Sequence, residues 1–141
     1  AFIPMITGTG GNSGTQASVA VIRALSLDEV AFRDIGRVVW KELRVALMCG
    51  TCLGGANFVK MMLIDRLLLG NAAVTPTVAL VVCLTLLLVV CFAKLVGCSL
   101  PILAERIGLD PAVMASPFIS TVVDAISLMI YFNFASLLLG L

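Results

Sequence analysis

Residues 76–93 read PTVALVVCLTLLLVVCFA, and this stretch without one charged side chain decides the fold class. A bilayer has a hydrocarbon core about 30 Å thick, which a helix of about 20 residues can cross. Thr75 can cap such a helix, and Pro76 suits its first turn. Apart from Lys94, the chain stays uncharged as far as residue 104. The stretch therefore predicts a membrane-spanning helix over about residues 76–103.

The composition of the whole chain also indicates that lipid is its solvent. Hydrophobic residues make up 61% of the 141 residues, charged residues make up 12%, and the mean hydropathy is +1.17. A soluble domain has about a quarter charged residues. The net charge of +1, without a basic tail, gives no indication of a nucleic-acid partner. We therefore expect a protein whose main partner is the lipid bilayer.

The gaps between groups of charges predict three further spans. Residues 1–22 are uncharged, nine charges crowd into residues 23–44, and residues 45–59 and 111–123 are uncharged again. We therefore expect an all-α, polytopic transmembrane helix bundle with spans at about residues 2–25, 43–66, 76–103 and 112–140. The segment at about residues 28–42 is amphipathic, and this predicts a helix at the membrane surface before the second span.

The distribution of lysine and arginine predicts the orientation. Five of them lie in residues 23–44 and two in residues 94–111, whereas only Lys60 and Arg66 belong to the opposite side. Basic loops are retained in the cytoplasm. The loops at 23–44 and 94–111 are therefore expected to be cytoplasmic, in the plasma (inner) membrane, with both ends of the chain outside. An outside start predicts an odd number of spans before residue 1.

Asp124 is the most informative single residue, because it is the only charge after Asp110. It falls near the middle of the last expected span. A carboxylate at the bilayer centre costs about 2.5–3.5 kcal/mol even on a lenient insertion scale, so it should face a bundle interior or an aqueous cavity. Asp124 therefore indicates a path for cations. A protonated or hydrogen-bonded structural acid is the alternative.

A polar, glycine-rich stretch inside the first expected span is the second candidate feature. Residues 7–16 read TGTGGNSGTQ, which cannot face lipid. One interpretation is an irregular backbone that lines a water-filled cavity, where carbonyl groups, threonine hydroxyls and the Asn12 amide supply neutral oxygens. The other is close helix packing, because Gly10 and Gly14 form a small-xxx-small motif. The stretch alone does not choose between them.

One carboxylate with amide and hydroxyl oxygens suits a hard cation, since no histidine or thiol accompanies it. Mg²⁺ loses its water reluctantly, so a few carboxylates and a wide polar lining are enough to bind it. A two-fold dimer would place two copies of Asp124 and Asn12 around one axis. An intramembrane aspartyl protease needs two carboxylates that share a site. Only Asp124 lies deep in a span, so we do not expect an enzyme.

The same two segments carry a resemblance to a known family. Pro4 with the GNSGTQ of residues 11–16 and the VIRAL of residues 21–25 resembles the second transmembrane helix of the MgtE magnesium channels. The DPA of residues 110–112, the PFISTVVD of residues 117–124 and the IYF of residues 130–132 are similar to the last helix of that family. Order, spacing and span count agree over the whole chain.

The resemblance implies a homodimeric Mg²⁺ channel with five spans per subunit, of which this chain holds the last four. It implies a pore on the dimer axis between the helices of residues 1–25 and 112–140. The Mg²⁺-sensing cytoplasmic domains of the family are not part of this sequence. Mg²⁺ is then both the ligand and the transported ion. Its expected ligands are the side chains of Asp124 and Asn12 and the backbone oxygens of Gly8 and Ser120, with Thr9, Gly11 and Thr121 lining the pore.

Two other functions stay open at this point. A secondary transporter could exchange Mg²⁺ for Na⁺ or H⁺, with Asp124 as the coupling site. A purely structural membrane subunit would need no ion path at all. A channel needs no coupling ion, because a divalent ion gains about 4.6 kcal/mol on crossing 100 mV, which is twice about 2.3 kcal/mol per charge.

Overall fold

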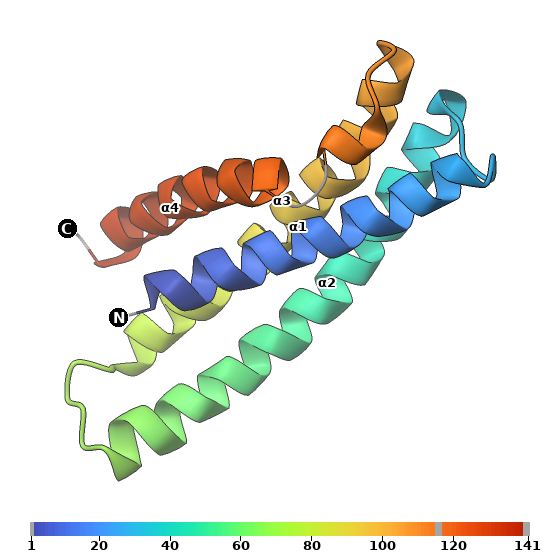
Figure 1. The fold of residues 1–141 in the computed structure, drawn as a ribbon. Coiled ribbons are helices and arrows are strands. Elements are labelled where there is room, and N and C mark those ends of the chain that lie inside the picture. The colour runs from blue at the N-terminus through green and yellow to red at the C-terminus, as the bar shows by residue number, and fades with distance from the viewer. Residues whose placement is uncertain (1, 115–116, 140–141) are drawn as a thin grey trace.

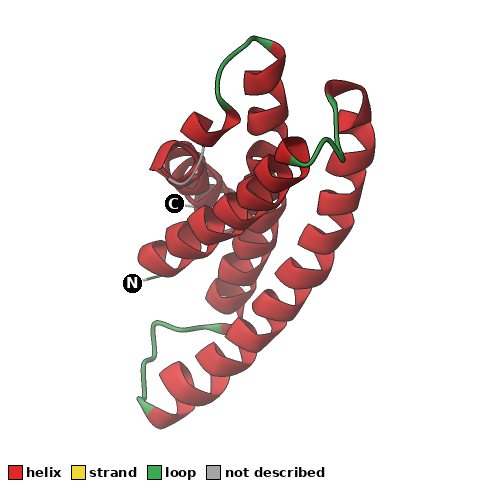
Figure 2. Ribbon diagram, turned by 45° about the vertical axis from the view of Figure 1, so that its right-hand side comes forward, coloured by secondary structure: helices red, strands yellow, loops and turns green. Residues whose placement is uncertain are grey.

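The computed structural model describes residues 2–114 and 117–139, and this part of the chain is helical without any strand (Figure 2). The expected all-α class is confirmed. The four long helices are α1 (Ile3–Ser26), α2 (Ile35–Lys60), α3 (Pro76–Arg106) and α4 (Pro117–Leu139). Shorter pieces are the 3-10 turns η1 (Phe32–Asp34) and η3 (Pro111–Met114), and the π-helix η2 (Met61–Leu68), which continues α2.

Three stretches of the described chain are long and apolar enough to cross a membrane. They are Phe32–Leu68, the whole of α3, and Pro117–Leu137. Helix α1 has 24 residues but does not qualify by composition. Its polar residues 7–16 lower its hydropathy, so it needs protein or water on part of its surface.

The segment expected at the membrane surface consists of a turn followed by the start of α2. Residues 27–31 form a turn around Asp28, which has a positive φ of 54°. Helix α2 then begins at Ile35 and runs into the expected second span without a break. Residues 35–42 are thus the first turns of α2 and are continuous with the expected second span.

Helix α3 is the centre of the bundle (Figure 1). It packs against α1, α2 and α4, and α1 also packs against α4, whereas α2 makes its extensive contact with α3 alone. The start of α1 and the end of α4 lie at the same end of the bundle, as Figure 1 shows. At the opposite end, Phe32 of η1 contacts the last turn of α3, where the Arg106 guanidinium lies 3.9 Å from its ring centroid.

Helices α1 and α3 touch through their backbones. A Cβ atom at Gly97 of α3 would overlap the carbonyl oxygen of Gly14 and lie 3.0 Å from its Cα atom. At Gly10, one turn before Gly14, a Cβ atom would lie 2.6 Å from Cγ1 of Val89. Glycine is required at Gly97 because a Cβ atom would meet the Gly14 backbone, and at Gly10 because it would meet the Val89 side chain.

We expect Gly97→Ala to destabilise the protein by about 1–3 kcal/mol, the usual cost of overpacking a well-packed interior. The reason is that the added methyl group meets backbone, which cannot rotate away. Thermal unfolding in detergent would measure the effect. Gly55→Ala is the matched control, since no atom lies within 4 Å of its Cβ position. Equal shifts for both variants would contradict the packing described here.

A largely buried ion pair joins α2 to α3. The Lys94 ammonium lies 2.9 Å from a carboxylate oxygen of Glu42, and the two side chains are 12% and 13% exposed. On the same α2–α3 interface, the Cys83 thiol donates to the Gly54 carbonyl at 3.1 Å. The helix that packs on only one neighbour is thus held by polar contacts as well as by apolar ones.

Candidate ion site between α1 and α4

Asp124 lies in the third turn of α4 and faces helix α1. A Cβ atom at Gly11 would lie 3.6 Å from Oδ1 of Asp124 and 3.6 Å from Oγ of Ser120. The carboxylate, the Ser120 hydroxyl and the bare backbone at Gly11 therefore meet at one point. Asp124 and Ser120 come together because they are four residues apart on a helix, so they share a face.

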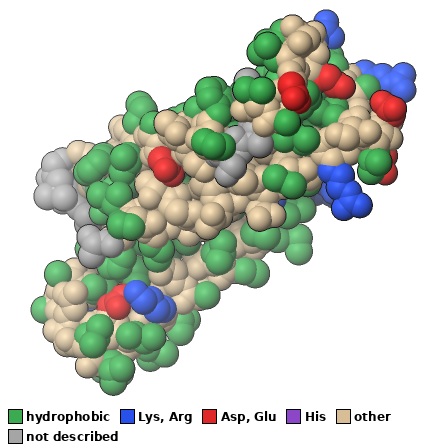
Figure 3. All heavy atoms as spheres, in the orientation of Figure 1, with side chains coloured by type: hydrophobic (Ala, Val, Ile, Leu, Met, Phe, Trp, Pro, Cys, Tyr) green, Lys and Arg blue, Asp and Glu red, His purple; other side chains and the backbone are tan. Residues whose placement is uncertain are grey.

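The Asp124 carboxylate is half-buried and carries no partner within the described residues. The ion pairs found there are Arg33–Asp34, Lys60–Asp65 and Lys94–Glu42, and none of them includes Asp124. On the face shown in Figure 3, most charged side chains gather at the two ends of the bundle, and one acidic side chain lies apart. An unpaired carboxylate at this depth is costly unless it meets water or a cation.

The glycine-rich stretch forms a regular helix, which corrects the expectation of an irregular backbone. Residues 7–16 lie inside α1, which is continuous from Ile3 to Ser26. Contacts with α3 and α4 hold this part of the helix in place, although glycine weakens a helix by about 1 kcal/mol per residue. Close packing is therefore the correct interpretation for Gly10 and Gly14, which are buried.

The other side of the same helix is open. Asn12 and Gly8 are exposed one turn apart, and no atom lies within 4 Å of a Cβ position at Gly8. Their backbone carbonyls belong to the helical ladder, in which each accepts the N–H four residues further on. A carbonyl oxygen has a second lone pair, so Gly8 and Ser120 can still accept a hydrogen bond from water.

The structure gathers some of the expected site residues and leaves others apart. Asp124, Ser120 and Gly11 lie together, and Thr9 is half-buried on α1. Thr121 is exposed, and its hydroxyl donates to the Pro117 carbonyl at 2.8 Å. No hydrogen bond in the described chain joins Asn12, Gly8 or Thr121 to the carboxylate. Of the four expected ligands, the structure thus brings Asp124 and Ser120 together.

Sequence reasoning missed Ser127, which lies one turn after Asp124. It is 2% exposed, its hydroxyl donates to the Val123 carbonyl at 2.6 Å, and it borders Gly10 at 3.1 Å from the Cβ position. The three-residue spacing from Asp124 could have indicated it, since both residues lie on the α1 side of α4. Ser127 closes the interface beside the site.

One carboxylate with neutral oxygen atoms suits a cation that keeps its hydration shell. Within residues 2–114 and 117–139, no three histidine, cysteine or acidic side chains lie close enough to hold a metal ion. A dehydrated divalent cation would need several carboxylates, whereas a hydrated one can be held through water by one carboxylate and neutral oxygens.

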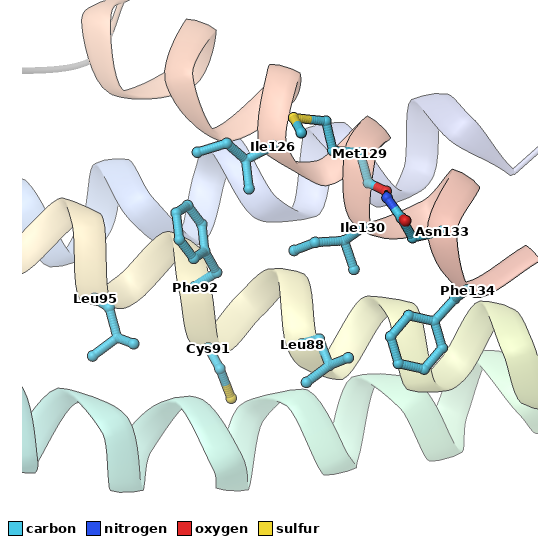
Figure 4. A pocket seen from close by; sticks show the side chains of 9 residues that line it. All are labelled: Leu88, Cys91, Phe92, Leu95, Ile126, Met129, Ile130, Asn133 and Phe134. Carbon is cyan, nitrogen blue, oxygen red and sulfur yellow. The ribbon is translucent and has the colours of Figure 1, made fainter. Parts of the chain in front are cut away.

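A groove of about 770 Å³ between α3 and α4 is a different feature (Figure 4). Its lining is apolar apart from the Asn133 amide, which donates to the Met129 carbonyl at 2.7 Å. Such a surface suits lipid or another apolar helix and not an ion. The side chains that line it are Leu88, Cys91, Phe92 and Leu95 of α3 and Ile126, Met129, Ile130, Asn133 and Phe134 of α4.

Comparison with known proteins identifies the family. The family model MgtE, described as a divalent cation transporter, matches residues 3–134. The chain is 38% identical over 139 residues to "Magnesium transporter MgtE" of Thermus thermophilus, which covers 98% of this chain and 29% of that protein. Proteins of the same name from Enterococcus faecalis and Bacillus subtilis are each 33% identical, over 136 and 135 residues, covering 96% of this chain and 28% of each relative. The chain thus spans less than a third of the length of these relatives, and it belongs to the MgtE family of divalent cation transporters, which are integral membrane proteins.

Proposed function

We propose that this chain supplies the pore of a Mg²⁺ channel, through which the hydrated ion enters down its electrochemical gradient. The observation that carries the proposal is the meeting of Asp124 and Ser120 with the bare backbone of α1 at Gly11. A lone carboxylate in a membrane-spanning helix marks an ion path. Because the chain belongs to a family of divalent cation transporters, we assign that path to a divalent cation.

Within this proposal, Asp124 holds the hydrated ion electrostatically, and the neutral oxygens orient its water. The Asn12 amide and the backbone oxygens of Gly8 and Ser120 are the expected acceptors, with Thr9, Gly11 and Thr121 lining the path. The waters of Mg²⁺ donate hydrogen bonds, so oxygen acceptors are the groups required. No residue has to displace that water, which allows the ion to leave again.

A homodimer completes the proposed site. Asn12 on α1 and Thr121 on α4 are exposed polar residues within helices of a membrane protein. A second copy related by a two-fold axis would bring the same polar surface to face itself, with a second Asp124 across the axis. Two carboxylates around one axis form the acidic ring that favours cations. We place the basic ends of the helices, residues 23–44 and 94–111, on the cytoplasmic side of the plasma membrane.

A flux assay distinguishes the channel from an exchanger. The full-length protein would be reconstituted in liposomes that contain a Mg²⁺-sensitive dye, with equal Na⁺ and pH on both sides. We expect a K⁺ diffusion potential, negative inside, to drive Mg²⁺ entry, because a channel needs no coupling ion. Entry that requires an opposing Na⁺ or H⁺ gradient at zero potential would establish the exchanger instead, with Asp124 as its coupling site.

A further inference from the structure

A second groove lies at the end of the bundle where most basic residues gather. It has a volume of about 440 Å³, and Phe32 of η1, the last turns of α3 and Phe118 of α4 form its walls. Its lining is apolar except for Arg106. Leu103, Ile107 and Phe118 are 43%, 72% and 47% exposed, so three large apolar side chains along the groove stay uncovered by the chain itself.

Arg106 lies at this groove without an acidic partner in the part of the chain described by the structure. The Phe32 ring holds its guanidinium group at 3.9 Å by a cation–π contact. That contact fixes the position of the group but leaves its charge and its N–H donors unused. A guanidinium group can donate two parallel hydrogen bonds to a phosphate group.

The groove lies at the level where lipid headgroups are expected. Helix α3 has 31 residues, or about 46 Å at about 1.5 Å per residue, so its ends extend beyond a hydrocarbon core of about 30 Å. Arg106 is the last residue of that helix. The basic residues 23–44 start from the same end, where η1 contacts α3. Anionic lipids concentrate in the leaflet that faces such basic segments.

We propose that this groove, lined by Phe32, Leu103, Arg106, Ile107 and Phe118, is a binding site for one anionic phospholipid. The lipid phosphate pairs with the Arg106 guanidinium, and the upper part of an acyl chain lies against Leu103, Ile107 and Phe118. The positive charge of Arg106, which has no acidic partner in the described chain, favours an acidic headgroup. The exposed apolar side chains favour a lipid over a free anion. This proposal depends on the membrane setting of the chain and not on the ion that it transports.

Native mass spectrometry would test the site. The full-length protein would be released into detergent from vesicles of equal parts phosphatidylcholine and phosphatidylglycerol, and the retained phosphatidylglycerol would be counted. We expect Arg106→Gln to lower this retention about fivefold, the effect of one basic residue near a charged membrane surface. Arg106→Lys should recover part of it. Leu103→Trp fills the groove but leaves Arg106 in place, and it should lower the retention of phosphatidylglycerol as well.

Arg37→Gln is the matched control, because Arg37 is an exposed arginine of α2 that does not line the groove. It should leave retention unchanged, and an equal loss for both arginine variants would overturn the proposal in favour of a diffuse surface charge. Unchanged retention in Arg106→Gln would also overturn it. Stabilisation of the wild type by inorganic phosphate alone would show an anion site and not a lipid site. Dissociation of an oligomer by Leu103→Trp would show that another protein copy covers the groove.

Discussion

Asp124→Asn should lower Mg²⁺ flux through the full-length protein in liposomes by at least about tenfold. The substitution keeps the volume of the side chain and removes its charge. A loss of about 1.4 kcal/mol in the binding of the ion is already a tenfold change, and two copies of the carboxylate would be lost in a dimer. Dye-reported Mg²⁺ entry under a fixed K⁺ diffusion potential measures the effect.

Asp110→Asn is the control for this experiment. Asp110 is the next acidic residue upstream and lies in the loop between α3 and α4, where its side-chain oxygen accepts the Ala112 N–H at 2.9 Å. Asparagine can make the same bond, so flux and stability should stay as in the wild type.

Thermal unfolding of the Asp124 variant separates an ion site from a structural acid. In the described residues, Asp124 takes part in no ion pair or hydrogen bond. Removing its charge should therefore leave the unfolding temperature unchanged or raise it, because an unpaired charge within the membrane is unfavourable. A large decrease in that temperature, with normal flux per folded molecule, would contradict the role proposed for Asp124.

Lys94→Met should be the most destabilising substitution in the α2–α3 interface. It leaves the Glu42 carboxylate, which is 13% exposed, without its partner. Breaking a buried ion pair from one side costs about 3–5 kcal/mol, because an uncompensated charge stays behind. The free energy of unfolding in mixed detergent would report the change.

The double variant Lys94→Met with Glu42→Gln tests the reason for that loss. It removes both charges, so most of the stability should return, and the coupling energy of the double-mutant cycle should be favourable for the wild-type pair. Arg33→Met is the comparison variant, since Arg33 is 89% exposed and its partner Asp34, at 4.0 Å, is 30% exposed. It should cost no more than about 1 kcal/mol. A similar cost for Arg33→Met and Lys94→Met would show that burial does not set the strength of these pairs.

The positions of the helices followed from the sequence because charge and hydropathy are local properties. The span expected at residues 76–103 corresponds to α3, which runs from Pro76 to Arg106. The span expected at residues 2–25 corresponds to α1, which runs from Ile3 to Ser26. The continuous helix through residues 35–42 was not foreseen. Amphipathic composition describes one face of a helix but does not say whether the helix ends at the membrane surface.

Contacts between distant segments could not be read from the chain. Lys94 was seen only as an interruption of an apolar stretch, and its partner Glu42 lies 52 residues earlier. The glycine-rich stretch allowed two interpretations, because a single helix does not reveal which of its faces is covered. The structure assigns Gly10 and Gly14 to packing and leaves Asn12 exposed. That Asp124 binds an ion stays a prediction.

The backbone contact between Gly14 and Gly97 also fixes the position of α1 against α3. Gly14 is one turn from Gly11, the residue that faces Asp124, so the same rigid helix carries both contacts. Side chains can adopt another rotamer when two helices slide, but two backbones in contact have no such freedom. The height of Gly11 along α3 is therefore fixed by a contact that contains no functional group. A methyl group added at Gly97 would push α1 away from α3 and displace the backbone that faces Asp124.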